Sequence, residues 1–452
     1  MVKTRFAPSP TGWLHIGGVR TALFSWLFAK SQGGEFCIRI DDTDTTRSTQ
    51  DFCDSIINAL KSLGLNSDRK LIYQSKRFDY YIDQIELLLN QGHAYYDKVE
   101  VTDKTKDTNL NIQYNNRLNK PDHVIRFKNP RSEKIILKDL VHNDITFDPK
   151  TFHDVVILRS NGIPTYNLTS VADDADMEIT HIIRGDDHLS NTAVQINLFN
   201  ALGHKVPIFG HLPMIHGVDG KRLSKRHGAV DINSFLSDGY LVEALINYLV
   251  KTGWSHGDDE FFTLDELLKL FTIDKVTKSS AIFDYDKLNW LNQHYIKNKS
   301  IKDIADMIIP YLNSLDVNVN DRDYVETILS LGIDRDYNLK DIANGMTHYF
   351  QDKLIYNLDS FPKINIEKSK NILENVLKKI NENEFKNKEA ISNDMKQVCT
   401  DMSLKFKDIG PVIRFALTAK LKAPSIDELC FTLGKNRSLK RLNDFYTFII
   451  NL

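Results

Sequence analysis

Blocks of apolar residues with two different spacings follow one another through the first 72 residues. Read in order, they predict a strand over residues 2–6, a helix around 22–27, a strand over 36–40 and a helix around 56–63. A proline- and glycine-containing cluster at 8–12 stops the first strand, and Gly33-Gly34 ends the first helix. Strands that alternate with helices in this way predict a parallel sheet with crossover helices.

The pattern changes after residue 72 and returns before residue 166. Residues 103–119 are polar and rich in asparagine and lysine, which favours an insertion on the surface of the first domain. Alternation of strand and helix resumes with strands over 154–158 and 179–183, a helix around 194–202 and a strand over 206–209. After Gly228 helical periodicity dominates.

These changes predict an α/β fold with further domains. We expect a doubly wound, Rossmann-like parallel-sheet domain that carries an inserted α+β domain and is followed by all-α domains. The predicted boundaries are 1–72 and 166–226 for the parallel-sheet domain, 73–165 for the insertion, 227–302 for a helical domain and 303–452 for an all-helical region.

Composition narrows the class of protein. Hydrophobic residues make up 42% and charged residues 26%, which is typical of a globular protein. The formal net charge of -2 argues mildly against RNA binding, although a basic face can coexist with an acidic remainder. The four cysteines form no CxxC pair, so neither a disulfide framework nor a zinc site is indicated. The sequence shows no membrane-spanning run and no apolar signal segment, so we expect a cytoplasmic protein without a membrane partner.

The first candidate for chemistry lies where the first strand hands over to a helix. It reads Pro8-Ser9-Pro10-Thr11-Gly12-Trp13-Leu14-His15-Ile16-Gly17-Gly18. In a doubly wound sheet, ligands bind at the carboxyl ends of the strands, and a helix N-terminus there offers N–H groups to phosphate. A histidine at this place can donate a hydrogen bond to phosphate oxygens. Taken alone, an ordinary strand–helix turn is the simpler interpretation of His15.

The second candidate is a glycine-flanked basic loop that follows a predicted strand. It reads Asp219-Gly220-Lys221-Arg222-Leu223-Ser224-Lys225-Arg226-His227-Gly228. Such a loop can neutralise a polyphosphate. Taken alone, a basic surface loop or a patch that contacts nucleic acid fits the same residues.

Together, in this order, the two segments resemble the paired signatures of class I aminoacyl-tRNA synthetases. Gly18 replaces the usual final histidine of the first signature, and Arg222-Leu223-Ser224-Lys225-Arg226 resembles the second. Within class I the chain is most similar to bacterial glutamyl-tRNA synthetases, through segments in family order. These are Arg5–Gly12, Arg39–Asp44, Pro164–Leu168, Ile183–His188, Leu223–Gly228 and Phe283–Leu291.

The resemblance implies a glutamate–tRNA ligase that uses ATP with Mg²⁺, and it assigns residues to roles. His15 and Lys225 would be catalytic. The ATP-binding residues would be Pro8, Ser9, Pro10, Thr11, Gly12, His15, Gly17, Gly18, Arg222, Leu223, Ser224, Lys225 and Arg226. The glutamate-binding residues would be Arg5, Ser9, Asp41, Tyr166 and Arg184. Guanidinium groups fit a carboxylate, although arginines more often form structural ion pairs. Asp41 stands where the family commonly has glutamate.

The resemblance also concerns the tRNA and the metals. The insertion would contact the acceptor end of tRNA(Glu) or tRNA(Gln), the C-terminal helices would bind the anticodon, and Arg335 would lie near the last anticodon base. Many relatives bind zinc in the insertion through cysteines, which this insertion lacks, so we expect no structural zinc and no other protein-held metal. A monomer is the family expectation.

For some charged groups, a structural or surface role explains the sequence at least as well as a role in binding. Asp173-Asp174-Ala175-Asp176 is interpreted as structural, and His181 and His188 as ordinary polar residues near a sheet edge. The basic cluster of Lys435, Arg437, Lys440 and Arg441 either contacts phosphate or is a solvated helix end.

Three other functions compete with the synthetase. They are a shorter relative that glutamylates a tRNA base, a small nucleotidyltransferase that shares the first signature, and an inactive RNA-binding paralogue. The long C-terminal region opposes the first, and the length of the chain with its glutamate-type motifs opposes the second. The presence of Arg5, His15, Arg184 and Lys225 opposes the third.

Overall fold

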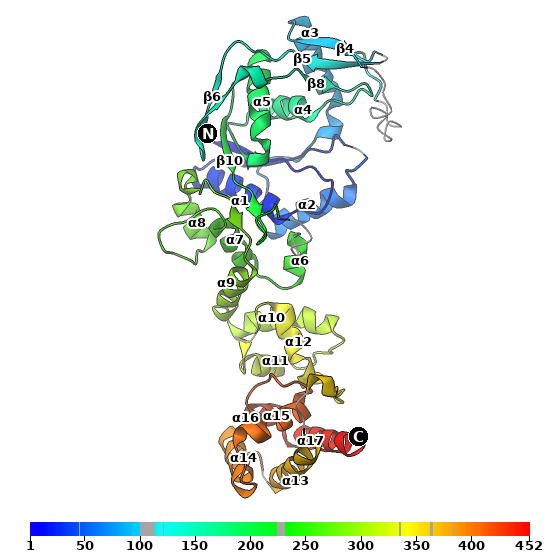
Figure 1. Ribbon diagram of the computed structural model, residues 1–452, viewed down its shortest axis with the longest axis vertical. Helices are drawn as coiled ribbons and strands as arrows, with labels where there is room; N and C mark the ends of the chain where they lie inside the picture. The colour runs from blue at the N-terminus through cyan, green and yellow to red at the C-terminus, as the bar shows by residue number, and fades with distance from the viewer. Residues whose placement is uncertain are drawn as a thin grey trace. The chain divides into compact units, whose positions relative to one another are not determined.

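The computed structural model describes residues 1–44, 46–99, 114–120, 122–223, 231–333, 336–361, 365–382 and 384–452. It divides into two compact units, Met1–Leu291 and Asn292–Leu452, which are described separately (Figure 1). The four regions predicted from the sequence stay a prediction. No helix in the described ranges is long and apolar enough to cross a membrane.

A parallel sheet in the first unit carries the site. Strand β2 (Glu35–Ile40) pairs with β1 (Lys3–Phe6) and β3 (Ile72–Tyr73), and β9 (His181–Gly185) pairs with β10 (Ile208–Leu212). A backbone hydrogen bond of 3.0 Å from the Thr180 N–H to the Lys3 carbonyl brings β9 beside β1. The chain leaves β1 toward β2 on one side and returns as β9 on the other, so ligand-binding loops meet at their carboxyl ends.

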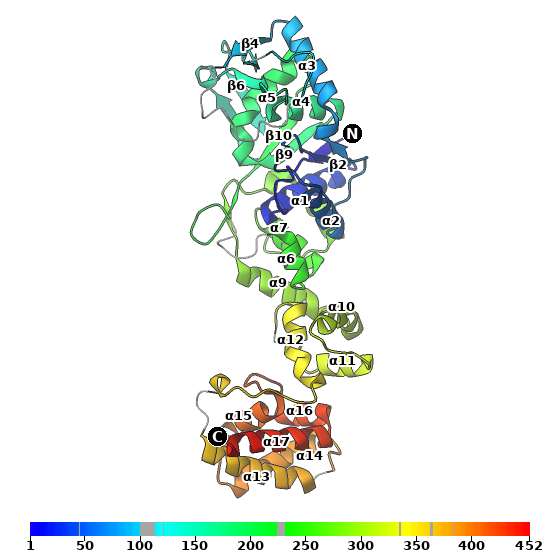
Figure 2. The same ribbon diagram turned by 90° about the vertical axis from the view of Figure 1, so that its right-hand side faces the viewer.

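Helix α1 (Ile16–Ser31) lies under this sheet, between the strands and helix α7 (Val242–Lys251) (Figure 2). It also packs against α8 (Leu264–Leu270). It is apolar on nearly all sides, which suits a helix covered on both faces. Leu23, Phe24 and Leu27 are fully buried. The helix thereby fixes the loop after β1 against the core.

Three more helices complete the parallel-sheet part. Helix α2 (Gln50–Ser62) begins at the N-cap Thr49, whose hydroxyl accepts a hydrogen bond from the Phe52 N–H. Helices α4 (Tyr166–Asp176) and α5 (Leu189–Ala201) pack against each other, and α4 contributes Leu168 and Val171 to a buried cluster.

The insertion is an α+β structure, in agreement with the predicted fold class. Its elements are α3 (Phe78–Asn90), an antiparallel sheet of β4 (Ala94–Lys98), β5 (His123–Phe127) and β8 (Val155–Leu158), and a hairpin of β6 (Ile135–Asp139) and β7 (Asn143–Phe147). The strand predicted at 154–158 is β8, and it pairs antiparallel with β5 inside the predicted insertion. Four apolar residues in a row fit either kind of sheet.

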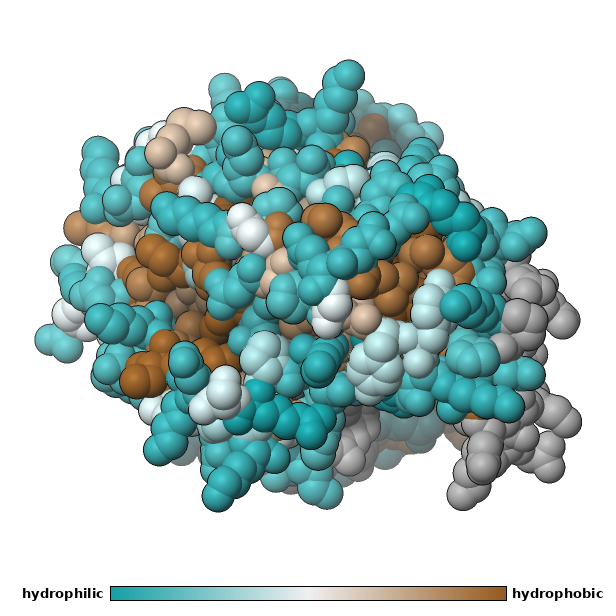
Figure 3. Space-filling view, turned by 90° about the horizontal axis from the view of Figure 1, so that it is seen from above, coloured by the Kyte–Doolittle hydropathy of each residue, from teal (hydrophilic) through white to brown (hydrophobic). Residues whose placement is uncertain are grey.

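The surface at the insertion end of this unit is mainly hydrophilic, with apolar patches between the polar groups (Figure 3). Ile136, on the outer face of the β6–β7 hairpin, is 63% exposed. The inner side of the same hairpin reaches the parallel sheet, because the Leu140 N–H donates to the Phe209 carbonyl at 2.9 Å. The insertion is thus joined directly to strand β10.

The remaining elements of the first unit follow β10. They are β11 (Ile215–His216), α6 (Ile232–Ser237), β12 (Ala281–Ile282), which pairs with β11, and α9 (Tyr285–Lys297), in which the unit boundary falls.

The second unit is helical, and no strand occurs in its described residues. Its helices are α10 (Ile301–Ser314), α11 (Arg322–Leu329), α12 (Leu339–Phe350), α13 (Ile366–Glu382), α14 (Lys388–Asp401), α15 (Phe406–Thr418), α16 (Ile426–Leu433) and α17 (Lys435–Ile450).

The basic cluster on α17 is interpreted from the sequence as a phosphate contact or as a solvated helix end. Both interpretations are wrong for Arg441, which is buried and donates to the carbonyls of Leu417, His348 and Gln351.

Candidate functional site

A cavity of about 470 Å³ opens at the carboxyl ends of β1, β2 and β9. The predicted site residues that line it are Arg5, Pro8, Ser9, Thr11, Gly12, His15, Gly17, Gly18, Asp41, Tyr166, Arg184, Arg222 and Leu223. Pro10 is buried and is not part of the lining. Ser224, Lys225 and Arg226, like Arg335, lie outside the described residues.

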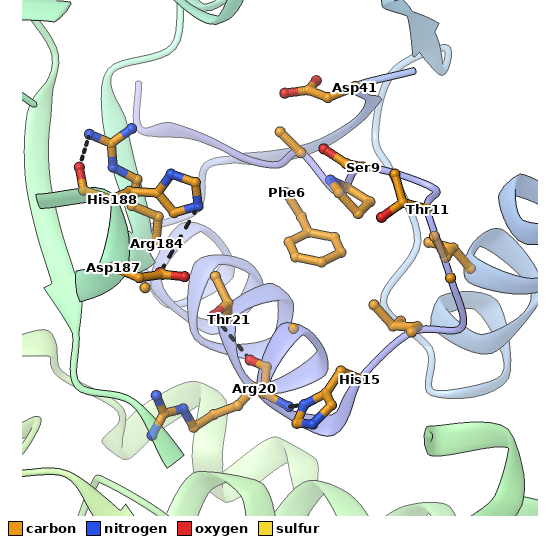
Figure 4. Close-up of a pocket in the computed structure, with 18 of the residues that line it drawn as sticks. Phe6, Ser9, Thr11, His15, Arg20, Thr21, Asp41, Arg184, Asp187 and His188 are labelled. Atoms are coloured by element: carbon orange, nitrogen blue, oxygen red, sulfur yellow. Dashed lines mark hydrogen bonds and ion pairs between the residues drawn. The ribbon is translucent and has the colours of Figure 1, made fainter. Parts of the chain in front are cut away.

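Two groups of side chains face each other across the cavity. Figure 4 shows Arg184 and His188 on one side, with Ser9, Thr11 and Asp41 on the other. The first group comes from the end of β9 and the turn after it, and the second from the ends of β1 and β2. Residues from three sequence segments far apart in the chain therefore form one site.

His15 is the N-cap of α1. Its Nδ1 accepts a hydrogen bond of 3.1 Å from the Gly17 N–H, so the proton of the neutral ring is on Nε2. Burial, followed by the positive charge of Arg222, lowers the pKa of His15, against the opposing effects of the Leu223 backbone and Asp231. At neutral pH the ring is therefore an uncharged donor at the N-terminal end of a helix.

The described part of the basic loop is close to this histidine. Leu223 is buried, and its N–H donates to the Ile215 carbonyl at 3.1 Å. The side chain of Arg222 is 69% exposed and lies 3.4 Å from the carboxylate of Asp187. The two sequence signatures therefore meet at the cavity as far as the structure describes them.

Arg5 and Asp41 belong to a buried network of charges. Arg5 donates to both oxygens of Asp174, at 3.0 and 3.3 Å. Arg39 donates to Asp174 at 2.6 Å and to both oxygens of Asp41 at 2.7 and 3.2 Å. Burial alone would raise the pKa of Asp174, but Arg5 and Arg39 outweigh it and lower the pKa. Burial, against the opposing effect of Arg39, raises the pKa of Asp41 to about 6. The charge of Arg5 is largely balanced by the carboxylate of Asp174.

The acidic run of α4 has the structural role that the sequence predicts. Asp173 accepts hydrogen bonds from Gln74, Arg77 and Tyr81 at 2.8, 2.9 and 2.8 Å. Asp174 binds the two arginines of the site from behind the cavity wall. These carboxylates hold arginines that line the cavity.

Arg184 has different surroundings. Its side chain is only 5% exposed, and it donates to the His211 Nε2, the Thr192 hydroxyl and the Tyr166 hydroxyl at 3.2, 2.8 and 3.4 Å. No ion pair joins it to a carboxylate within the described part of the chain. Burial lowers the pKa of Arg184, with Tyr166 acting in the opposite direction. A buried guanidinium without a counter-ion favours an anionic ligand.

Tyr166 links Arg184 to His188. The Tyr166 hydroxyl lies 3.1 Å from His188 Nδ1 and accepts from Arg184. Because the hydroxyl accepts from Arg184, its own proton is available for His188. Burial, followed by Arg184, lowers the pKa of His188. His188 therefore belongs to the cavity wall, and its interpretation as an ordinary residue near a sheet edge is incomplete.

Two further arginines of the cavity wall, Arg20 and Arg39, have no role predicted from the sequence. Arg20 lies on the buried helix α1 and donates to the carbonyls of Thr252, at 3.1 Å, and Pro213. Arg39 interrupts an otherwise apolar strand. The sequence signal that could have identified both is a charged residue within an apolar stretch, because such a residue is seldom buried without a partner. Their partners lie too far along the chain to be read from spacing.

Among the described residues, no group of three or more histidine, cysteine, aspartate or glutamate side chains is arranged to hold a metal ion.

Comparison with known proteins assigns the chain to a family. Residues 1–290 match the family described as "tRNA synthetases class I (E and Q), catalytic domain", and residues 303–446 match "Anticodon binding domain". The chain belongs to the class I tRNA synthetases of the E and Q type. This family implies the use of ATP.

Individual relatives match the synthetase over its whole length. "Glutamate--tRNA ligase 1" of Coxiella burnetii (strain RSA 331 / Henzerling II) is 41% identical over 462 residues, which cover 99% of this chain and 98% of that protein. "Glutamate--tRNA ligase" of Lawsonia intracellularis (strain PHE/MN1-00) is 41% identical over 457 residues, 98% of each chain. The crystal structure of a glutamate tRNA ligase from Elizabethkingia meningosepticum CCUG26117 in complex with its amino acid has a TM-score of 0.82 at 30% identity over 99% of both chains.

The fold class and the glutamate-type synthetase family predicted from the sequence are thereby confirmed, and with them the prediction that the protein is a ligase. The match at 303–446 also disfavours the shorter relative that lacks the C-terminal helical domains.

Proposed function

We propose that this synthetase activates L-glutamate with ATP and transfers the glutamyl group to the terminal adenosine of tRNA(Glu), with tRNA(Gln) as the alternative second or main acceptor. The observation that carries the proposal is the buried guanidinium of Arg184, which has only neutral partners in the described cavity. A ligand carboxylate supplies the missing charge.

In this proposal the glutamate side chain binds at Arg184 and Tyr166. Arg5 is already held by Asp174, so it adds a second, weaker cationic contact and fixes the edge of the subsite. Asp41 receives the ammonium group through the lone pairs that Arg39 leaves unused. Because aspartate is one methylene shorter than glutamate, we expect this contact to run partly through water.

The nucleotide occupies the His15 side of the cavity. The Nε2–H of His15 donates to the phosphates at the N-terminal end of α1, where the helix dipole also favours negative charge. Lys225 neutralises the pyrophosphate as it leaves. The Mg²⁺ that ATP brings is coordinated mainly by the nucleotide, since such sites usually lack a cage of protein ligands.

The reaction has two steps. An oxygen of the glutamate α-carboxylate attacks the α-phosphorus of ATP, and pyrophosphate leaves with the bonding electron pair. A ribose hydroxyl of the terminal adenosine then attacks the acyl carbon, and AMP leaves. Both steps depend mainly on positioning and charge stabilisation. We propose that the insertion contacts the acceptor end of the tRNA and that the second unit, including Arg335, contacts the anticodon.

Steady-state charging with Arg184→Gln tests the assignment of the side-chain subsite. The variant should raise the KM for glutamate by at least tenfold and leave the KM for ATP nearly unchanged, because its target is the carboxylate of one substrate. Arg69→Gln is the matched control, since Arg69 forms an exposed ion pair with Glu35. An Arg184→Gln enzyme with the parental KM for glutamate would overturn this assignment.

A further inference from the structure

Arg184 is held by a buried chain of hydrogen bonds that begins in the insertion. The Asp139 carboxylate lies 2.6 Å from His211 Nδ1, and His211 Nε2 lies 3.2 Å from Arg184 Nε. Asp139 is at the end of β6, His211 is on β10 and Arg184 is on β9. The side chains of Asp139 and His211 are fully buried.

The hydrogen bonds fix the protonation of His211. The Arg184 Nε–H can only donate, so His211 Nε2 must accept, and the ring proton must be on Nδ1, where it is donated to Asp139. Thr192 is compatible with this arrangement, because its hydroxyl accepts from Arg184 at 2.8 Å and can donate to the His188 carbonyl at 3.4 Å. The single lone pair of His211 Nε2, 3.0 Å from this hydroxyl, is then left for Arg184.

Asp139 is fixed in turn by the backbone. Its Oδ1 accepts from the N–H groups of Val141 and His142, each at 2.9 Å, and from the His211 N–H at 3.2 Å. The carboxylate therefore has one oxygen for the backbone and one for the imidazole, and its position leaves the ring little freedom.

We propose that Asp139 and His211 are positioning residues for glutamate recognition: Asp139 fixes the His211 tautomer, and His211 orients the Arg184 guanidinium without neutralising it. The proposal rests on the proposed role of Arg184 as the contact of the substrate carboxylate. A carboxylate in direct contact with Arg184 would also orient it, but would compete with the substrate for its charge. A neutral imidazole acceptor orients the group and leaves the charge to the ligand.

The proposal gives the insertion a role in binding the amino acid as well as the tRNA. Asp139 lies within the region 73–165 that the sequence predicts to contact tRNA, although its partner supports the amino-acid subsite. In this proposal the β6–β7 hairpin supports the glutamate subsite through His211, although none of its residues lines the cavity.

The variant Asp139→Asn tests the proposal with almost no change of shape. The asparagine Oδ1 can still accept from the backbone, but its Nδ2 is a donor, so His211 must move its proton to Nε2 and then faces the Arg184 N–H. We expect the KM for glutamate in tRNA charging to rise at least tenfold, with the KM for ATP within twofold of the parent. Tenfold corresponds to about 1.4 kcal/mol.

Two variants of His211 separate positioning from packing. His211→Gln provides a neutral acceptor oxygen near the place of Nε2 and should recover part of the affinity, whereas His211→Leu keeps the bulk without an acceptor and should raise the KM for glutamate as Asp139→Asn does. Asn197→Asp is the control. Asn197 lies on α5, the helix that also carries Thr192, and makes a buried hydrogen bond of 2.6 Å to Asn129, but no hydrogen bond joins it to Arg184 among the described residues.

The outcomes are distinct for the two proposals. In one outcome the parent charges glutamate, Arg184→Gln raises the KM for glutamate, and folded Asp139→Asn and His211→Leu leave this KM unchanged. The positioning role is then wrong and the proposed function stands. Equal rises of the KM for glutamate and for ATP, also in Asn197→Asp, would show a structural role only. A parent that does not charge glutamate would overturn the proposed function itself.

Discussion

Arg39 and Asp41 form a bidentate ion pair in which Nε and Nη2 meet the two carboxylate oxygens at 2.7 and 3.2 Å. The Arg39 side chain is 0% and the Asp41 side chain 4% exposed. Arg39 also reaches Asp174, which holds Arg5, so this pair connects two strands of the sheet with the wall of the glutamate subsite.

Breaking this pair should destabilise the first unit. Asp41→Ala leaves part of the Arg39 guanidinium buried and unpaired, which we expect to lower the free energy of unfolding by about 3 kcal/mol. All four tryptophans, Trp13, Trp26, Trp254 and Trp290, belong to the first unit, so urea unfolding followed by tryptophan fluorescence measures it selectively. Asp83→Asn, which breaks an exposed pair with Arg117, should cost less than about 1 kcal/mol. Similar losses for the two variants would contradict this account.

His15 combines a structural and a catalytic role that one substitution can separate. His15→Asn replaces the Nδ1 acceptor of the Gly17 N–H by an amide oxygen but removes the Nε2 donor, so stability should change little. The kcat for charging should fall by about 100-fold, because a donor to the developing charge is lost. His15→Ala should in addition lower stability by about 1 kcal/mol. A His15→Asn enzyme with parental kcat would remove His15 from the catalytic groups.

Gly34 lies where the chain turns from α1 into β2. A Cβ at this position would be 2.3 Å from the Val2 carbonyl oxygen, and backbone atoms cannot move aside as a flexible side chain can. We expect Gly34→Ala to destabilise the first unit by more than about 2 kcal/mol. At Gly33 a Cβ would meet nothing within 4 Å, and its φ of 61° is tolerated by asparagine. Gly33→Asn should therefore be the milder variant in the same fluorescence assay.

His348 makes the second unit sensitive to acid. Burial, followed by the charges of Lys420 and Arg441, lowers its pKa from 6.5 to about 3. The folded state keeps the ring neutral while the unfolded state takes up a proton below pH 6.5, so the stabilisation is complete above pH 6.5 and is lost as the pH falls toward 3. The loss should be about 1.4 kcal/mol per pH unit in this window.

His348→Gln removes this titration and should flatten the acid dependence. Far-UV circular dichroism reports the unfolding of both units, whereas tryptophan fluorescence reports the first unit only. The part of the urea transition that is seen by circular dichroism alone therefore measures the second unit. An equal slope of stability against pH in the parent and in His348→Gln would show that another group is responsible.

The local elements of the first unit could be predicted closely, because their signals are local. The strand expected over 36–40 is Glu35–Ile40, and the helix expected to end at Gly33-Gly34 ends at Ser31. The partner of β8 could not be predicted, since Val155–Leu158 contains no residue that distinguishes a parallel from an antiparallel neighbour.

The composition of the site was predictable through the family resemblance, but its electrostatics were not. The sequence marks Arg5 and Arg184 alike as carboxylate clamps, whereas the structure pairs Arg5 with Asp174, 169 residues away, and gives Arg184 only neutral partners. Asp139 and His211 escaped notice because 72 residues separate them and neither belongs to a motif. Contacts at such distances follow from the topology of the sheet.

The most direct test of the central claim is the charging of radiolabelled glutamate onto purified tRNA(Glu) and tRNA(Gln) separately, with ATP and Mg²⁺, by the parent and by Lys225→Ala. We predict that the parent charges tRNA(Glu), tRNA(Gln) or both, and that Lys225→Ala charges at least 100-fold more slowly, about 2.7 kcal/mol in activation free energy. Failure of the parent to charge either tRNA, with Lys225→Ala indistinguishable from it, would contradict the account and favour an inactive RNA-binding paralogue.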